Sequence, residues 1–253
     1  MDEIANFLKQ RIIFIKMDTE KIWKEEDWTS DARQIIDGLK LFPDNSKIIL
    51  ILRHSHRDEP DGLEKAQKLR LTPQGHAIAK KFGENLPSSR TIKILHSIIW
   101  RCEETAQDIH KGFNSIGGAS EIKGNLSPLQ DAGIKDREFF LNEFTNVPFF
   151  DIFYRWVAGF YKPNVWTPFI EYCQTTAHII LDQVKNSPEN GLNIFVSHDM
   201  NVMALRFGWF GLRPKQWVKF LGGFAFTVEG EQTLLLDYGE LKSVAIPHYM
   251  QKS

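Results

Sequence analysis

Three short runs of branched, apolar residues predict buried strands at residues 47–52, 91–96 and 193–197. Each run is too short for a core helix and is apolar almost throughout, which is typical of a strand covered on both faces of a parallel sheet. Helical patterns follow the second and third runs, over residues 101–111 and 200–207. This alternation of strand and helix predicts an α/β fold with a mostly parallel central sheet and crossover helices.

Two segments outside this alternation have helical character. Residues 1–45 carry apolar side chains at three-to-four spacing and end in a turn sequence, Phe42-Pro43-Asp44-Asn45, which predicts an N-terminal helical extension packed on the domain. Residues 139–175 are rich in aromatic side chains and show no strand alternation, so we expect a helical insertion that packs on the sheet and on itself. The same insertion is a candidate cap over a substrate pocket. The length of 253 residues suits one compact domain spanning 1–253.

Composition excludes several function classes. The formal net charge is −1, and 42% hydrophobic with 25% charged residues is ordinary for a globular protein, so no bulk field attracts nucleic acid or an anionic membrane. No apolar run approaches the roughly 18 residues that span a bilayer. Asp2 and Glu3 stand where a secretory signal would carry positive charge, which predicts a cytoplasmic protein. Cys102 and Cys173 lack metal-ligand spacing and are expected to be reduced thiols.

Charged and polar side chains gather at the ends of the three predicted strands. Because ligands in open α/β sheets bind beyond the carboxyl ends of the strands, these side chains are expected to line one pocket. Three guanidinium groups around one point favour a dianionic phosphoryl group, since each planar fork binds phosphate oxygens in pairs. The residues are Arg53, His54, Ser55, His56 and Arg57 after the first strand, Ser97 and Arg101 after the second, and His198 and Asp199 after the third.

A histidine beside such a clamp has a defined chemical use. Its neutral ring nitrogen can attack phosphorus and form a phosphohistidine, while the arginines stabilise charge on the equatorial oxygens. The leaving alkoxide then needs a proton from a carboxyl group opposite the nucleophile, for which Asp199 is a candidate. Asp199 is also placed to act as the N-cap of the helix that begins near Met200, and both roles are compatible.

Four motifs in order along the chain resemble those of the histidine phosphatase superfamily, the phosphoglycerate mutase-like and acid phosphatase-like enzymes. The family's Arg-His-Gly corresponds to Arg53-His54-Ser55, its Leu-Thr-x-x-Gly to Leu71-Thr72-Pro73-Gln74-Gly75, its Ser-x-x-x-Arg-x-x-x-Thr-Ala to Ser97, Arg101, Thr105 and Ala106, and its late Ser-His to Ser197-His198. The resemblance implies a three-layer α/β/α fold with a mostly parallel central sheet, phosphoglycerate mutase-like, carrying the helical insertion. It also implies a metal-independent phosphomonoesterase without a cofactor.

The resemblance assigns roles residue by residue. It implies that His54 is the nucleophile, and that Arg53, Arg57, Arg101 and His198 bind the phosphoryl group. The acid phosphatase-like branch takes its proton from the Asp of a late His-Asp pair, here Asp199; the mutase-like branch takes it from a residue to which Asp131 loosely corresponds, and Asp199 is favoured. Ser55 replaces the family glycine, so its hydroxyl is expected either to bind substrate or to crowd the phosphate.

Other functions use the same residues. A mutase would return the phosphoryl group of the same intermediate to an acceptor, and a non-catalytic module would keep the phosphate clamp but not turn over. A metal hydrolase would instead use His54, His56, His198 and Asp199 as ligands, although three arginines would repel the cation. A phosphorylated small molecule is the expected partner, and the sequence predicts neither its identity nor an oligomeric state.

Overall fold

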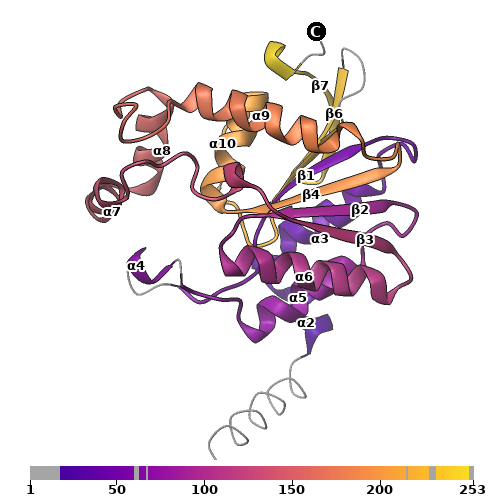
Figure 1. The fold of residues 1–253 in the computed structure, drawn as a ribbon. Helices are drawn as coiled ribbons and strands as arrows, with labels where there is room; N and C mark the ends of the chain where they lie inside the picture. The colour runs from indigo at the N-terminus through magenta and orange to yellow at the C-terminus, as the bar shows by residue number, and fades with distance from the viewer. Residues whose placement is uncertain (1–17, 60–62, 67, 215, 228–231, 251–253) are drawn as a thin grey trace, which may run out of the picture.

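The computed structural model describes residues 18–59, 63–66, 68–214, 216–227 and 232–250. Their strands form one sheet in the order β3-β2-β4-β1-β5-β6-β7 (Figure 1). The parallel half contains the three predicted strands and an edge strand: β1 (Ile48–Arg53), β2 (Thr91–His96), β3 (Ala119–Asn125) and β4 (Gly191–Ser197). The prediction of an α/β fold with a mostly parallel central sheet is confirmed.

The other half of the sheet is antiparallel. Its strands are β5 (Gly223–Thr227), β6 (Gln232–Asp237) and β7 (Glu240–Ala245), and β5 runs antiparallel beside β1. Gly223 stands opposite Leu52 in this pairing. A Cβ at Gly223 would collide with the backbone carbonyl of Ile51, so glycine permits the close approach of the two strands.

Alternate side chains of β1 enter two separate hydrophobic cores. The helices around them are α3 (Ser30–Leu39), α5 (Pro73–Glu84), α6 (Trp100–Ser115), α9 (Phe169–Lys185) and α10 (Asp199–Phe210). Ile48, Leu50 and Leu52 pack with residues of α3, α5 and α6. Ile49 and Ile51 pack with residues of α9 and α10. This period-two burial places a layer of helices on each face of the sheet, as Figure 1 shows.

The N-terminal segment is helical where the structure describes it. It contains α2 (Thr19–Glu25), the 3₁₀ turn η1 (Asp27–Thr29) and α3. Ile35, Ile36 and Leu39 of α3 are buried in the core that contains Ile48, so this helix is part of the covering layer. The part of the predicted extension that falls on residues 1–17 lies outside the described residues.

The aromatic-rich segment forms helices beside the sheet. They are α7 (Arg137–Asn146), α8 (Phe149–Val157) and the start of α9, and they lie on the left in Figure 1. Trp156 stacks on Trp166 with ring centroids 4.6 Å apart, and both indoles are almost fully buried. The segment is therefore helical, and its buried aromatic rings belong to the same hydrophobic core as Ile49 and Ile51 of β1.

Shorter elements complete the chain. They are α4 (Leu63–Ala66), η2 (Ser127–Leu129) and η3 (His248–Met250). In the part of the chain that the structure describes, no helix combines the length and the apolarity that crossing a bilayer requires.

Candidate active site

The carboxyl ends of β1, β2 and β4 lie side by side at one edge of the sheet, and the charged residues predicted to form a site follow these ends. Arg53 is the last residue of β1, and the next residue, His54, donates its backbone N–H to the carbonyl of Ser197 at the end of β4, over 2.9 Å. Ser97 follows β2 and donates its N–H to the carbonyl of Val196 over 2.9 Å. These two hydrogen bonds hold the ends of β1 and β2 against the end of β4, so the side chains that follow the three strands lie close together.

The His54 imidazole is buried and uncharged. Its Nδ1 lies 2.7 Å from the Ser55 carbonyl, which can only accept, so Nδ1 carries the proton and Nε2 keeps its lone pair. The Arg101 guanidinium donates its Nε–H to that Nε2 over 2.9 Å. Burial of a side chain that is only 2% exposed, followed by the charge of Arg101, holds the pKa of His54 well below its usual value. The imidazole therefore has the protonation state that a nucleophile needs.

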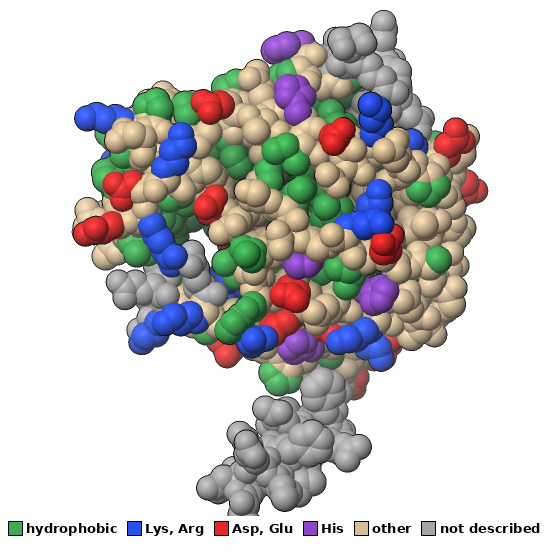
Figure 2. Space-filling view, in the orientation of Figure 1, with side chains coloured by type: hydrophobic (Ala, Val, Ile, Leu, Met, Phe, Trp, Pro, Cys, Tyr) green, Lys and Arg blue, Asp and Glu red, His purple; other side chains and the backbone are tan. Residues whose placement is uncertain are grey.

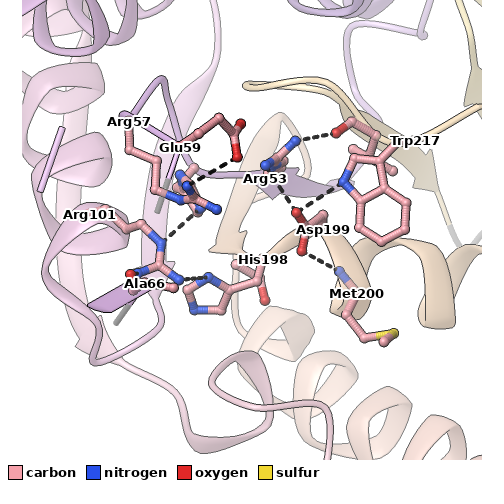
Figure 3. A network of polar contacts seen from close by, with 12 residues as sticks. Arg53, Arg57, Glu59, Ala66, Arg101, His198, Asp199, Met200 and Trp217 are labelled. Carbon is pink, nitrogen blue, oxygen red and sulfur yellow. Dashed lines mark hydrogen bonds and ion pairs between the residues drawn. The ribbon is translucent and has the colours of Figure 1, made fainter. Parts of the chain in front are cut away.

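Arg101 also connects His54 to two other elements. It donates one N–H to Nδ1 of His198 over 3.1 Å and another to the carbonyl of Ala66, in α4, over 2.9 Å (Figure 3). Because Nδ1 of His198 accepts, its Nε2 carries the proton and donates to the Ser97 hydroxyl over 3.0 Å. Burial and the Arg101 charge lower the pKa of His198 to about 3. His198 is thus a neutral group in the site.

Asp199 lies against the second arginine of the clamp. Its Oδ2 is 3.0 Å from an Arg53 nitrogen and accepts the indole N–H of Trp217 over 3.1 Å, while Oδ1 accepts the backbone N–H of Met200 over 2.9 Å (Figure 3). Burial is the largest influence and raises the pKa of Asp199, but the Arg53 charge and the hydrogen bonds from Met200 and Trp217 together outweigh it, so the pKa is lowered. In the ligand-free protein Asp199 is a carboxylate.

The predicted capping role of Asp199 is not what the structure shows. The N-cap position of α10 is His198, and its side chain makes no capping hydrogen bond. Asp199 is the first residue of the helix, and its carboxylate contacts the N–H of the next residue. A negative charge at this end is favourable to the helix dipole, so the residue still stabilises the helix start while facing the site.

The third arginine, Arg57, makes polar contacts only with residues close to it in the sequence among the described residues. Arg57 donates to the carbonyl of Asp58 over 2.7 Å and lies 3.9 Å from the Glu59 carboxylate. The Nε–H groups of Arg57 and Arg53 are buried and have no hydrogen-bond partner among the described residues. A buried donor without a partner costs free energy, which an anion bound between the arginines would recover.

These groups line a cavity of about 490 Å³. It opens where α7 and α8 face α4, on the left side of the molecule, and Figure 2 shows that side hollowed. Its polar end consists of predicted site residues from three strand ends, and the described residues on the rest of its wall are mostly apolar. The predicted residues at that end are Arg53, Arg57, Arg101, His198 and Asp199. His54 lies directly behind Arg101, with its ring centroid 5.5 Å from that of His198.

Ser55 is not placed to contact a ligand. Its hydroxyl donates to the Gly75 carbonyl over 2.7 Å and its N–H donates to the Thr105 hydroxyl over 3.0 Å. The residue is fully buried and does not line the cavity. Gly75 packs so closely on the backbone of His56 that a Cβ would collide with the carbonyl there. The serine therefore joins β1 to the start of α5, and neither of its expected effects on the phosphate, binding or crowding, is seen.

His56 lies apart from the other imidazoles. Its Nδ1 is 2.8 Å from the Thr72 hydroxyl, and its ring packs between Trp28 and Phe220, with centroids 4.9 and 5.0 Å away. A metal site built on His54 and His56 together is not supported by this geometry. Among the described residues no group of three or more His, Cys, Asp or Glu side chains is arranged to hold a metal ion.

Asp131 lines the same cavity as Asp199. The residue as a whole is exposed, but the protein around its carboxyl group desolvates that group and raises its pKa. The N–H that Gly133 donates to Oδ1 over 3.2 Å has the opposite, smaller effect on the pKa. The two candidate acids thus differ in the free protein. Asp131 holds a proton more readily, whereas Asp199 lies closer to the arginine clamp through its contact with Arg53.

Sequence reasoning missed the contact between Trp217 and Asp199. Trp217 lies in the irregular segment between α10 and β5, where no periodicity or motif marks a side chain as part of a site. It also missed the buried thiol of Cys102, whose Sγ is 3.7 Å from Nε2 of His198. Burial raises the pKa of this thiol to about 12, so it stays protonated and is no nucleophile.

Comparisons with known proteins agree with the fold. No protein-family model and no curated protein matches the sequence. The native structure of mycobacterial glucosyl-3-phosphoglycerate phosphatase is 13% identical, covers 79% of this chain and 97% of its own, and has a TM-score of 0.53. Its complex with VO3 is 12% identical over 79% of this chain and 97% of that chain, with a TM-score of 0.51.

A further solved structure, designated mycobacterial hydrolase 1, is 13% identical, covers 82% of this chain and all 100% of that chain, and has a TM-score of 0.51. At such identities the likeness is one of fold. The four motifs and the sheet that brings their residues together agree with it. The chain has a phosphoglycerate mutase-like α/β fold, as its motifs predicted.

Proposed function

We propose that the protein is a metal-independent phosphomonoesterase that works through a phosphohistidine on His54. One observation carries the proposal: a neutral, buried imidazole presents the lone pair of Nε2 to an arginine that also lines the cavity. The fold shared with a phosphatase supports the same reaction class. A hydrolysable phosphorylated small molecule is the expected substrate.

The clamp has the charge that a phosphoryl group requires. Arg53, Arg57 and Arg101 face one cavity, and two of them hold buried N–H groups that have no partner in the described part of the chain. A bound phosphoryl group would draw the Arg101 Nε–H away from His54 and onto an equatorial oxygen, which frees Nε2 to attack. The arginine therefore protects the nucleophile in the free protein and activates it on binding.

The chemistry then takes two displacements. In the first, the Nε2 lone pair of His54 forms a bond to phosphorus, the ester P–O bond breaks, and the leaving oxygen takes a proton from a carboxyl group. In the second, water attacks phosphorus, the P–N bond breaks, and the carboxylate takes the proton of the water. The products are an alcohol and inorganic phosphate, and His54 returns to its neutral state.

Asp199 is the acid that we favour, with Asp131 as the alternative. Arg53 keeps Asp199 ionised in the free protein, but a phosphate dianion bound to Arg53 would offset that charge and raise the Asp199 pKa. The acid would then gain its proton only when substrate is present. Asp131 has a raised pKa in the free protein, and this rise does not depend on a bound phosphate.

The test compares the wild type with His54→Ala and with His110→Ala, a histidine on α6 that binds Ser120 away from the cavity. We expect hydrolysis of p-nitrophenyl phosphate to fall to background only in His54→Ala. Acid-labile, base-stable phosphate on the wild-type protein should appear on rapid quenching. Activity should persist in chelator and be inhibited by vanadate.

Two results would point elsewhere. A wild type no faster than His54→Ala would indicate a non-catalytic phosphoryl-binding module. Transfer of labelled phosphate to an excess of an alcohol acceptor, with little free phosphate, would indicate a mutase that uses the same intermediate.

A further inference from the structure

Beyond the arginine clamp, part of the cavity lining is formed by aromatic rings. Phe140 and Phe144 come from α7, Phe149 comes from α8, and Trp217 comes from the segment before β5. Their ring centroids follow one another at 5.5, 4.9 and 3.9 Å, each pair tilted or edge to face. We call these four residues the aromatic wall. It is continuous from the insertion to the loop beside the clamp.

The aromatic wall differs from the buried aromatic rings of the same segment. Trp156 and Trp166 are almost fully buried against each other, whereas the four wall residues are only half-buried and line the cavity. Part of their ring surface thus faces a pocket, where an apolar ligand would cover it. A pocket with a few charged groups at one end and aromatic side chains elsewhere is typical of a small-molecule site.

The charges of the cavity limit what the leaving group can carry. Among the described residues that line it, the cationic side chains Arg53, Arg57 and Arg101 all belong to the phosphoryl end. Two further carboxyl groups line the cavity: that of Glu59, which lies 3.9 Å from Arg57 at the phosphoryl end, and that of Asp131. A leaving group with a carboxylate or a second phosphate would find no further cation among the described lining residues and would meet like charge at Asp131.

The aromatic wall ends at the favoured acid. The Trp217 indole donates to Oδ2 of Asp199, and its ring lies 3.9 Å, centroid to centroid, from that of Phe149. The ester oxygen that receives the proton of Asp199 would therefore lie next to Trp217. The rest of the leaving group, which is bonded to that oxygen, would then lie against Trp217 and Phe149.

Resting on the proposed function, we propose that the substrate is a phosphate monoester of an aromatic alcohol or phenol that carries no further anionic group. The phosphoryl group binds the three arginines, and the ring of the leaving group packs against Phe149 and Trp217. The volume of about 490 Å³ accommodates a phosphoryl group and an aromatic ring system. Edge-to-face contacts with the aromatic wall add to the apolar area that the ligand buries.

The test uses three primary alkyl esters, so that the leaving alcohols are all aliphatic: 2-phenylethyl phosphate, n-butyl phosphate and O-phosphoserine. We expect kcat/KM to be highest for 2-phenylethyl phosphate, by about tenfold or more over each of the others. Phe149→Ala should lower that value about tenfold and change the value for O-phosphoserine less than about twofold. Phe149→Leu, which keeps an apolar side chain, should lose part of the preference.

Phe139→Ala is the matched control. Phe139 is also an aromatic residue of the insertion, but its ring is 38% exposed, contacts Tyr161 and does not line the cavity. The Phe139→Ala variant should rank the three esters by kcat/KM in the same order as the wild type does. A wild type that prefers O-phosphoserine, or a preference that survives both Phe149 variants in folded protein, would overturn the inference.

Failure of the proposed function would look different. None of the three esters would be hydrolysed, and His54→Ala would match the wild type. Calorimetric binding of the same esters then decides the inference. Tighter binding of 2-phenylethyl phosphate, weakened by Phe149→Ala, would support it, and equal or weaker binding than O-phosphoserine would overturn it.

Discussion

Arg101 makes three contacts in the free protein, which a bound phosphoryl group would rearrange under the proposed function. Its guanidinium donates to Nε2 of His54, to Nδ1 of His198 and to the carbonyl of Ala66. The two imidazole acceptors are neutral, and a phosphoryl oxygen is a stronger acceptor because it is charged. The arginine can therefore exchange a neutral partner for an anion at little net loss, which is what a residue that serves both nucleophile and substrate requires.

Replacing Arg101 with Ala should remove charge-assisted contacts to the phosphoryl group and its contact to His54. We expect kcat/KM for p-nitrophenyl phosphate to fall on the order of 100-fold or more, since each such contact is stronger in the transition state. Arg101→Lys should recover little, because an ammonium lacks the planar fork that reaches His54 and His198 together. Steady-state kinetics on both variants, with circular dichroism to confirm folding, would check this. A near-normal rate in Arg101→Ala would remove the residue from the site.

Replacing Asp199 with Asn should separate the two candidate acids. An alkyl phosphate needs a proton on its leaving oxygen, whereas p-nitrophenolate leaves without one. If Asp199 is the acid, Asp199→Asn slows hydrolysis of an alkyl phosphate at least about tenfold more than that of p-nitrophenyl phosphate. Asp131→Asn is the matched variant and should slow both substrates alike. The reverse pattern in kcat/KM would assign the proton to Asp131.

At the scale of elements, what could be predicted from the sequence follows from local pattern. The strands that end at Arg53, His96 and Ser197 are short, apolar runs, and parallel strands bring their carboxyl ends to one edge. The residues that follow these ends were therefore predictable as one site. Trp217 and the rest of the aromatic wall were not, because their positions depend on how an irregular segment and an insertion pack together. Ser55 was misplaced for a related reason, since its partner Gly75 belongs to another element.

Glycines allow the backbones of α5 and α6 to approach each other closely where the two helices cross. A Cβ on Gly112 of α6 would collide with the carbonyl of Lys80 in α5, and a Cβ on Gly83 would collide with that of Ile109. We expect Gly112→Ala to lower the free energy of unfolding by about 1–3 kcal/mol, because neither backbone can move without disturbing its helix. Chemical denaturation would measure this.

Gln107→Ala is the control for Gly112→Ala. Gln107 is exposed on α6 and bonds Glu103 of the same helix, so its removal should change the unfolding free energy by less than about 0.5 kcal/mol. Equal stability of the two variants would show that the helices can separate at the crossing without cost.

At the scale of the whole molecule, the buried imidazoles connect the site to stability. Burial and the arginines hold the pKa values of His54 and His198 below the ordinary value, to about 3 for His198. The native protein keeps both rings neutral, whereas the unfolded chain takes up protons on them as the pH falls below about 6.5. The stability that goes with neutral rings is complete above that pH and is lost progressively toward pH 3.

The wild type should therefore be less stable at pH 5 than at pH 7.5. Each buried imidazole contributes a slope of roughly 1 kcal/mol per pH unit in the acid range. His54→Gln should flatten the dependence, because the side chain no longer titrates in either state. Since His76, whose pKa Asp108 raises, is common to both proteins, the difference between their unfolding curves isolates His54. Parallel curves would mean that His54 titrates normally in the folded protein.

The thiol of Cys102 sits 3.7 Å from Nε2 of His198, yet it is fully buried and its pKa is raised to about 12. Phosphatases that depend on a thiolate are silenced by peroxide, because the anion is the form that oxidises. A protonated sulfur behind the arginine clamp offers no such target, and the imidazole that we propose as nucleophile has no sulfur to oxidise. Under the proposed function, dephosphorylation by this chain would therefore continue in the presence of peroxide, when thiolate-dependent phosphatases stop.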